Sequence, residues 1–158
     1  MTKATFNFNR AYIFDPSRSG AKYSLNDGEN WVNHGEFAEV MLKSVLGYAA
    51  VKDACGAYDV TDDIPELNMS VKSSKATLVN RPLGYDFNSF KDVYFHTCHS
   101  TKWAYVSTTT ESLTVYYMDR DEFESFIDNW ATFTADRKVI RFKEESNKML
   151  RWLDERAD

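Results

Sequence analysis

Glycine, proline and cysteine are scarce in this chain. Its 158 residues include six Gly, three Pro and two Cys, which excludes a collagen-like or low-complexity protein and leaves no disulfide framework. Cys55 and Cys98 are therefore expected to be reduced thiols, as in proteins of the cytoplasm.

Long apolar runs are absent as well. No stretch approaches the roughly 20 apolar residues that a membrane-spanning helix needs, and the first residues lack the apolar core of a secretory signal peptide. We therefore expect no membrane partner and a cytoplasmic location.

Several motifs with known chemistry are missing. The chain has no phosphate-binding loop, no dinucleotide fingerprint and no Gly-x-Ser-x-Gly nucleophile elbow. His96, Cys98 and His99 lie close together, but they lack the paired spacing of zinc ligands, so we expect no zinc site. A nucleophile built from a Cys and a His remains an open alternative, because the chain has three His and two Cys.

The residues that are present predict one aromatic-rich globular domain over 1–158. Hydrophobic residues make up 43% of the chain and aromatic residues 15%, enough for a substantial core. Alternating or β-branched segments predict strands, and apolar residues at helical spacing predict helices. Asn26-Asp27-Gly28 is typical of a turn. The expected strands cover 5–9, 11–14, 66–72, 93–97, 103–107 and 113–118, and the expected helices cover 34–48, 120–133 and, as a basic C-terminal helix, 137–156.

The stretch from 56 to 75 has the highest density of potential chemistry. Three aspartates and a proline precede the segment 66–72, in which polar and apolar residues alternate, and this alternation indicates a strand with one polar face. Carboxylates can hold Mg²⁺ and a lysine can stabilise negative charge, which is what metal-assisted phosphodiester cleavage requires. The residues able to do so are Asp59, Asp63, Glu66 and Lys72. The alternative is an amphipathic edge strand whose polar face is only solvated.

This arrangement resembles the PD-(D/E)xK nuclease superfamily, the restriction-endonuclease-like fold. In that superfamily an acidic residue at a strand end is followed by an acid-x-lysine triplet on the next strand. Asp59 and the triplet Ser70-Val71-Lys72 match these positions, with Ser70 in place of the acid. Glu66 has the same strand parity as Ser70 and Lys72 and could supply the carboxylate, although it lies four residues from Ser70, roughly 13 Å along a strand.

The superfamily's core also begins with a helix that carries a glutamate, and Glu39 matches it, while a solvated pair with Lys43 is the alternative. The resemblance implies an α/β (α+β sandwich) fold with a mixed central sheet flanked by helices and a nuclease-like core over 35–133. It implies Mg²⁺ or Mn²⁺ as cofactor. The implied catalytic residues are Asp59, Lys72, Glu66 and Ser70, and the implied metal ligands are Asp59, Glu39 and Asp63.

The implied function is that of a hydrolase, a metal-dependent DNA endonuclease, and the resemblance further implies a homodimer, since two sites are needed to cut two strands. The net charge of −5 argues against a protein that coats nucleic acid, so clustered cations would have to contact the DNA. The expected contacts are Lys75, Arg81, Arg137, Lys138 and Arg141. One alternative is a non-catalytic protein- or DNA-binding module that retains the nuclease-like fold, and another is an unrelated α+β interaction protein.

Overall fold

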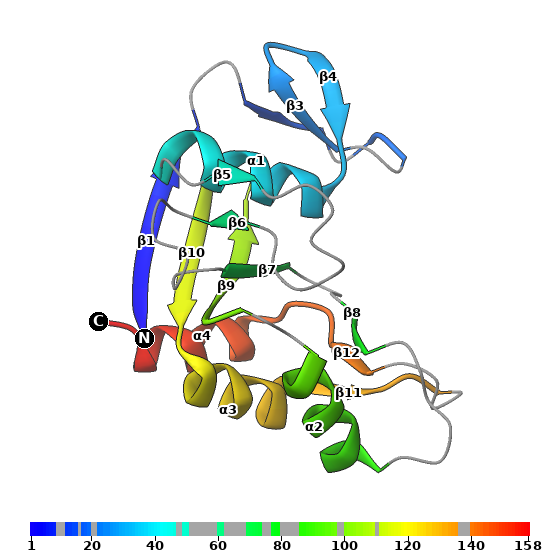
Figure 1. Cartoon of the computed structure of the whole chain (residues 1–158). Coiled ribbons are helices and arrows are strands. Elements are labelled where there is room, and N and C mark those ends of the chain that lie inside the picture. The colour runs from blue at the N-terminus through cyan, green and yellow to red at the C-terminus, as the bar shows by residue number, and fades with distance from the viewer. Residues whose placement is uncertain are drawn as a thin grey trace.

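The computed structural model contains both helices and strands (Figure 1). It describes residues 1–8, 12–15, 17–19, 22–46, 49–50, 60–61, 69–73, 77–79, 86–97, 100–109, 111–135 and 140–158. Four helices and three β-sheets lie within these residues. The expected α+β class is therefore confirmed.

A six-stranded mixed sheet forms the centre of the molecule. Its strands, from one edge to the other, are β1 (Thr2–Asn7), β10 (Ser112–Met118), β9 (Lys102–Thr108), β7 (Met69–Ser73), β6 (Val60–Thr61) and β5 (Ala49–Ala50). β7 and β9 are parallel, and the other neighbours are antiparallel. A parallel pair needs a crossover connection, and this crossover contains helix α2 (Phe87–Thr97).

Two three-stranded antiparallel sheets accompany the central sheet. One contains β2 (Ile13–Phe14), β3 (Tyr23–Asn26) and β4 (Glu29–Val32), and the other contains β11 (Ala131–Phe133), β12 (Ile140–Phe142) and β8 (Thr77–Val79). The predicted turn at Asn26-Asp27-Gly28 is confirmed. It joins β3 to β4 with φ of 47° at Asp27 and 91° at Gly28, the two positive angles that a two-residue hairpin turn needs.

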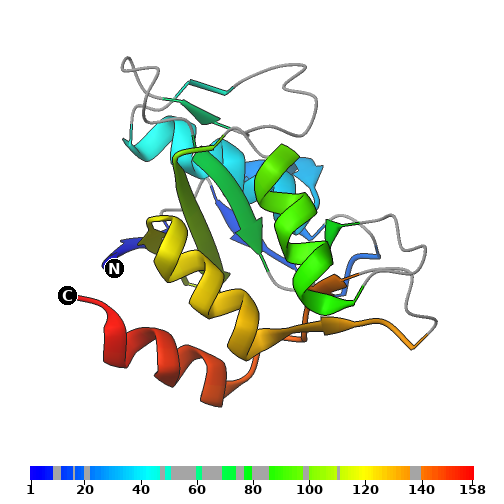
Figure 2. The same ribbon diagram turned by 60° about the horizontal axis from the view of Figure 1, so that its bottom comes forward.

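Helices cover both faces of the central sheet. Helix α1 (His34–Leu46) packs with the β2-β3-β4 sheet on one face, and α2, α3 (Arg120–Trp130) and α4 (Asn147–Arg156) lie on the other (Figure 2). The alternation along β9 produces this division, because Trp103 and Tyr105 belong to one buried cluster and Ala104 and Val106 to the other. We call these the α3 face and the α1 face.

Helix starts follow the capping signals of the sequence. Asp119 caps α3 by accepting a bond from the Glu122 N–H (2.8 Å), and the Glu122 side chain accepts one from the Asp119 N–H (3.1 Å). The two bonds together form a capping box. Asn33 caps α1 by accepting a bond from the Glu36 N–H (2.8 Å). Each cap satisfies a backbone donor that the helix itself leaves unpaired, a contribution of about 1 kcal/mol.

The strand predicted over 93–97 is wrong, because these residues are the last part of α2. The segment has the aromatic and β-branched residues of a strand, but the helix starts earlier, where Asp86 accepts a bond from the Ser89 N–H (2.8 Å). The buried residues then recur at helical spacing and form one face. They are Phe90, Lys91, Tyr94 and Phe95.

Two helix boundaries are also wrong. The helix predicted to reach Phe133 ends at Trp130, and Phe133 lies in β11, where its ring packs edge to face on Phe90 (5.2 Å). The helix predicted over 137–156 begins only after the cap Ser146, because Ile140–Phe142 form β12 between β11 and β8. Sheet pairing takes precedence over helical spacing in this segment.

Candidate functional site

Lys72 lies in β7, an interior strand between β6 and β9. Its neighbour across the parallel ladder is Tyr105, which is fully buried on the α3 face. The Lys72 Nζ lies 6.0 Å from the centroid of the Tyr94 ring on α2, at the outer limit of a cation–π contact. Lys72 is a half-buried residue, and its amine therefore lies on the α3 face of the sheet.

Tyr94 is held in place by its neighbours. Its hydroxyl oxygen accepts a hydrogen bond from the Trp103 indole N–H (3.0 Å), and the Trp103 ring stacks on Phe123 with centroids 5.4 Å apart. A fixed ring beside a lysine limits the positions that the amine can take. Such an amine can form a charge-assisted bond to a phosphate or carboxylate oxygen.

Glu39 lies on the opposite side of the sheet. It belongs to α1, whose buried residues Phe37, Ala38 and Met41 pack on the α1 face, whereas the Lys72 amine is on the α3 face. The structure therefore does not bring Glu39 and Lys72 together. The two residues are separated because side chains alternate between the two faces of a strand, and Lys72 lies on the face that α1 does not cover. The sequence of α1 alone does not show which face the helix covers.

Most of the other predicted site residues lie outside the described residues. They are Asp59, Asp63, Glu66, Lys75, Arg81, Arg137 and Lys138. Asp59 directly precedes Val60, the first residue of β6, and Val60 pairs with Met69, the residue before Ser70. Ser70 is itself in β7, with Trp103 as its partner on β9. Arg141 is exposed on β12, in a different sheet from Lys72.

The described residues contain no group of three or more His, Cys, Asp or Glu side chains that could hold a metal ion. His96 is exposed on α2, and Cys98 and His99 are outside the described residues. A set of three or more such ligands would therefore have to include residues outside the described ranges, among which are Asp59, Asp63 and Glu66.

A partly buried carboxylate network on the α3 face was not predicted from the sequence. Glu145 accepts hydrogen bonds from the Tyr105 hydroxyl and the Ser107 hydroxyl, both at 2.9 Å. Burial raises the pKa of Tyr105, and the Glu145 charge raises it further. The phenol therefore stays protonated and fastens the segment before α4 to β9. The partners are about 40 residues apart in the sequence, so no local spacing signals them.

A second tyrosine and carboxylate pair lies where β1, β10 and α4 meet. Asp154 accepts bonds from the Tyr116 hydroxyl (2.7 Å) and the Lys3 amine (2.8 Å). The Lys3 bond is the largest cause that lowers the pKa of Asp154. This pair fixes α4 to the edge of the sheet.

Lys91 is a buried lysine, with 9% of its surface exposed. Burial acts to lower its pKa, but hydrogen bonds to Asp128 (2.7 Å) and Glu124 (3.1 Å) outweigh this effect and raise the pKa of the amine. Both partners belong to α3, so this lysine joins α2 to α3 and has a structural role.

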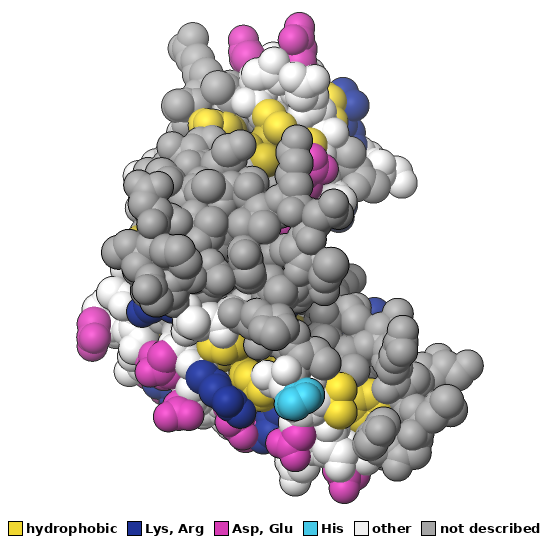
Figure 3. Space-filling model, viewed as in Figure 1, with side chains coloured by type: hydrophobic (Ala, Val, Ile, Leu, Met, Phe, Trp, Pro, Cys, Tyr) yellow, Lys and Arg dark blue, Asp and Glu magenta, His cyan; other side chains and the backbone are white. Residues whose placement is uncertain are grey.

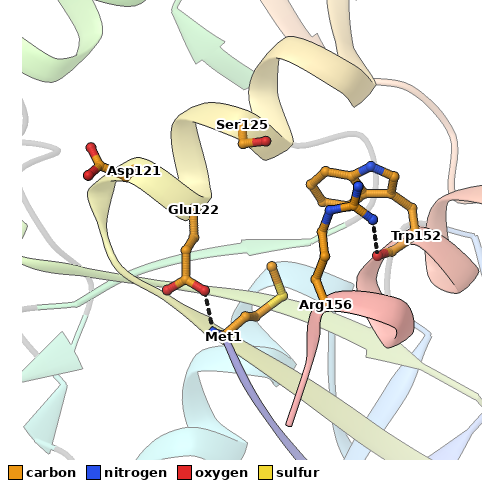
Figure 4. A pocket seen from close by; sticks show the side chains of 6 residues that line it. All are labelled: Met1, Asp121, Glu122, Ser125, Trp152 and Arg156. Carbon is orange, nitrogen blue, oxygen red and sulfur yellow. Dashed lines mark hydrogen bonds and ion pairs between the residues drawn. The ribbon is translucent and has the colours of Figure 1, made fainter.

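A pocket of about 390 Å³ lies between the start of α3 and the end of α4. In Figure 4 the Arg156 guanidinium overlaps the Trp152 ring, and the N-terminal amine is paired with Glu122. The guanidinium carbon lies 3.9 Å from the ring centroid. Met1, Asp121 and Ser125 complete the lining. None of the residues predicted for the site lines this pocket.

The surface around α2 and α3 carries charges of both signs. In Figure 3 acidic side chains lie among the basic ones over this part of the molecule. Helix α3 alone contributes Asp121, Glu122, Glu124 and Asp128 against Arg120. Among the described residues on the surface of α2 and α3, basic side chains do not form an extended patch that could contact a DNA backbone.

No helix within the described residues is both long enough and apolar enough to span a bilayer. No model of a known protein family matches the chain, and no curated protein matches it.

Proposed function

We propose that this protein is a metal-dependent DNA endonuclease of the restriction-endonuclease-like class, hydrolysing phosphodiester bonds with Mg²⁺ or Mn²⁺. The observation that carries the proposal is the half-buried residue Lys72, whose amine lies near Tyr94, on an interior strand of a mixed sheet. That strand follows a helix and a strand in the order that the superfamily's motif requires, as α1, β6 and β7.

Lys72 is proposed to orient the attacking water or to stabilise the negative charge that develops on the phosphate. The ring of Tyr94 supports this role, because it lies beside the amine and is itself held by a hydrogen bond from Trp103. Electrostatic stabilisation depends on a charge that is already in position.

The proposed metal ligands are Asp59, as the principal one, with Glu66 or Asp63 as the second carboxylate. When bound, the ion polarises the phosphate. Glu39 is a weaker candidate than its place in the helix suggested, because the sheet separates α1 from the Lys72 amine.

A non-catalytic binding module on the same scaffold is the second candidate. It is favoured by Ser70 at the position of the triplet's acid and by the acidic surface of α3. Such a module would bind DNA or a protein partner without a metal.

Calorimetric titration with Mg²⁺ and with Mn²⁺ tests the proposal. We expect the wild type and Glu39→Gln to bind the ion and Asp59→Asn to lose binding, because the loss of one carboxylate removes both a ligand and a negative charge. Glu39→Gln is the matched control, since it neutralises a carboxylate on the other side of the sheet. If the wild type binds DNA but binds neither metal ion, the result contradicts the nuclease proposal and supports the non-catalytic binding module.

A further inference from the structure

Strand β1 is an open edge of the central sheet. It pairs with β10 alone among the described strands, and Figures 1 and 2 both place it at the outside of the molecule. Edge strands present unpaired backbone groups to other chains, and proteins commonly protect them with proline, bulges or charge. The six residues of β1 contain neither a proline nor a register shift, and their one charged side chain, Lys3, is paired with Asp154.

Alternate residues of β1 direct their backbone groups outward. The Phe8 N–H donates to the Glu111 carbonyl (2.7 Å), so the position at Phe8 is a hydrogen-bonded pair with the β10 hairpin. In an antiparallel ladder hydrogen-bonded and non-hydrogen-bonded pairs alternate. Phe6, Ala4 and Thr2 therefore bond to β10. Lys3, Thr5 and Asn7 direct their N–H and C=O groups away from it.

The start of the strand agrees with this assignment. The Met1 carbonyl has the outward parity of Lys3, and it accepts a hydrogen bond from the Asp158 N–H (3.0 Å) rather than from β10. The C-terminal residue thus covers the edge at Met1. Among the described residues nothing bonds to the outward backbone groups of Lys3, Thr5 and Asn7.

We propose that a second copy of this chain pairs antiparallel with β1, about a two-fold axis beside Thr5. Thr5 then pairs with Thr5 of the partner subunit, and Lys3 pairs with Asn7 of the partner subunit. All three outward residues find partners in this register. Shifting the register by two residues in one direction would require the Met1 carbonyl, which Asp158 already occupies.

The side chains suit this register. The Thr5 pair places two hydroxyls together and Lys3 faces a neutral amide, so no like charges oppose each other. On the α1 face, the half-buried Ala4 meets the half-buried Phe6 of the partner subunit. A second copy is favoured over an unrelated peptide because two antiparallel copies of β1 are complementary. In this register the outward backbone groups of each copy pair with those of the other, and no like charges face each other. The inference depends on β1 and not on the proposed nuclease activity.

Sedimentation velocity over a range of concentrations tests the pairing. The wild type is expected to have the mass of two chains and Thr5→Pro that of one. Proline removes an outward N–H without removing a bond to β10. Thr5→Val is the matched control. It also loses the hydroxyl contact with Thr114 (3.1 Å) but keeps the backbone donor, so it should remain a dimer.

Cysteine cross-linking tests the register in case Thr5→Pro fails to fold. In a Cys55→Ser, Cys98→Ser background, Thr5→Cys places two thiols across the axis. The Cα atoms of such a pair are about 5.5 Å apart, within disulfide range. Lys3→Cys in the same background faces Asn7 of the partner subunit and should not cross-link.

A wild type that stays a single chain at every concentration overturns the inference. This holds even if β1 then proves to bind a different protein. A dimer that Thr5→Pro leaves intact, or cross-linking by Lys3→Cys but not by Thr5→Cys, also overturns it.

Discussion

The two faces of the central sheet bury different chemistry although they share the same strands. Towards α1, β9 and β10 present Ala104, Val106, Leu113 and Val115, which are small or aliphatic. Towards α3, the same strands present Trp103, Tyr105, Tyr116 and Met118, and the two tyrosine hydroxyls bond to Glu145 and Asp154. Polar atoms are buried on the α3 face because carboxylates from the C-terminal segment satisfy them.

The difference between the faces bears on the site. Lys72 directs its amine to the α3 face, where hydroxyls and carboxylates are already accommodated. Glu39 belongs to the helix that covers the apolar α1 face. The contrast therefore favours Lys72 as a functional group and counts against Glu39 as its partner.

The same substitution on each face measures how tightly that face is packed. We expect Phe123→Ala to lower the free energy of unfolding by about 4–5 kcal/mol and Phe37→Ala by about 3 kcal/mol. Phe123 is enclosed by buried rings, including Trp103 and Phe142, whereas half-buried Phe8 and Tyr12 beside Phe37 can move into the space. Urea unfolding checks this order, and an equal or larger loss for Phe37→Ala would contradict it.

Tyr105→Phe isolates the polar character of the α3 face. It removes the hydroxyl bond to Glu145, and we expect a loss of about 1–2 kcal/mol at neutral pH. Chemical unfolding of the variant and of the wild type in one buffer measures the difference. No loss would mean that solvent replaces the phenol at Glu145.

The same tyrosines predict a decline of stability in alkali. Burial raises the pKa of both Tyr105 and Tyr116 in the folded protein, so folding favours the protonated phenols. Their contribution is complete below the unfolded pKa of about 10. It is lost as pH rises beyond that value, by about 1.4 kcal/mol per pH unit for each tyrosine. The decline should be shallower in Tyr105→Phe, and an unchanged slope would contradict the assignment.

The smallest loss of stability is expected for the substitution of Asp154, which lies where the α3 face reaches solvent. Its pKa is lowered by Lys3 and by the Tyr116 hydroxyl, so its contribution is present above the unfolded pKa of about 4 and is lost as pH falls through the folded value. Its side chain is 47% exposed, so Asp154→Asn should cost less than about 1 kcal/mol at neutral pH. Unfolding curves between pH 2 and 7, with a flatter acid limb in the variant, check this prediction.

Local signals in the sequence were sufficient for β9, β10 and the start of α3. Aromatic and β-branched residues mark the two strands, and Asp119 with Glu122 marks the helix start. The segment 93–97 was misread because the same residue types suit a strand, while the deciding cap at Asp86 lies seven residues earlier. In β12, pairing with β8 and β11 overrides helical spacing.

The site was predictable only in part, because contacts between distant segments also decide which of its residues come together. Alternation placed Lys72 on a strand, and the structure has that strand as β7. Which face of the sheet α1 covers depends on contacts between distant segments. The position of Glu39 in the sequence therefore could not show that this residue lies on the opposite side of the sheet from the Lys72 amine. The bonds from Tyr105 and Ser107 to Glu145 also join distant segments.

Nicking of supercoiled plasmid in Mg²⁺ by the wild type and by Lys72→Met tests the central claim most directly. The methionine keeps the length of the side chain and removes its charge. We predict that the wild type nicks the plasmid and that Lys72→Met does so about 100- to 1,000-fold more slowly, as expected when one preorganised electrostatic group is lost. A wild type without nicking activity, or a variant that nicks at the wild-type rate, would contradict the assignment of Lys72 as the centre of a nuclease site.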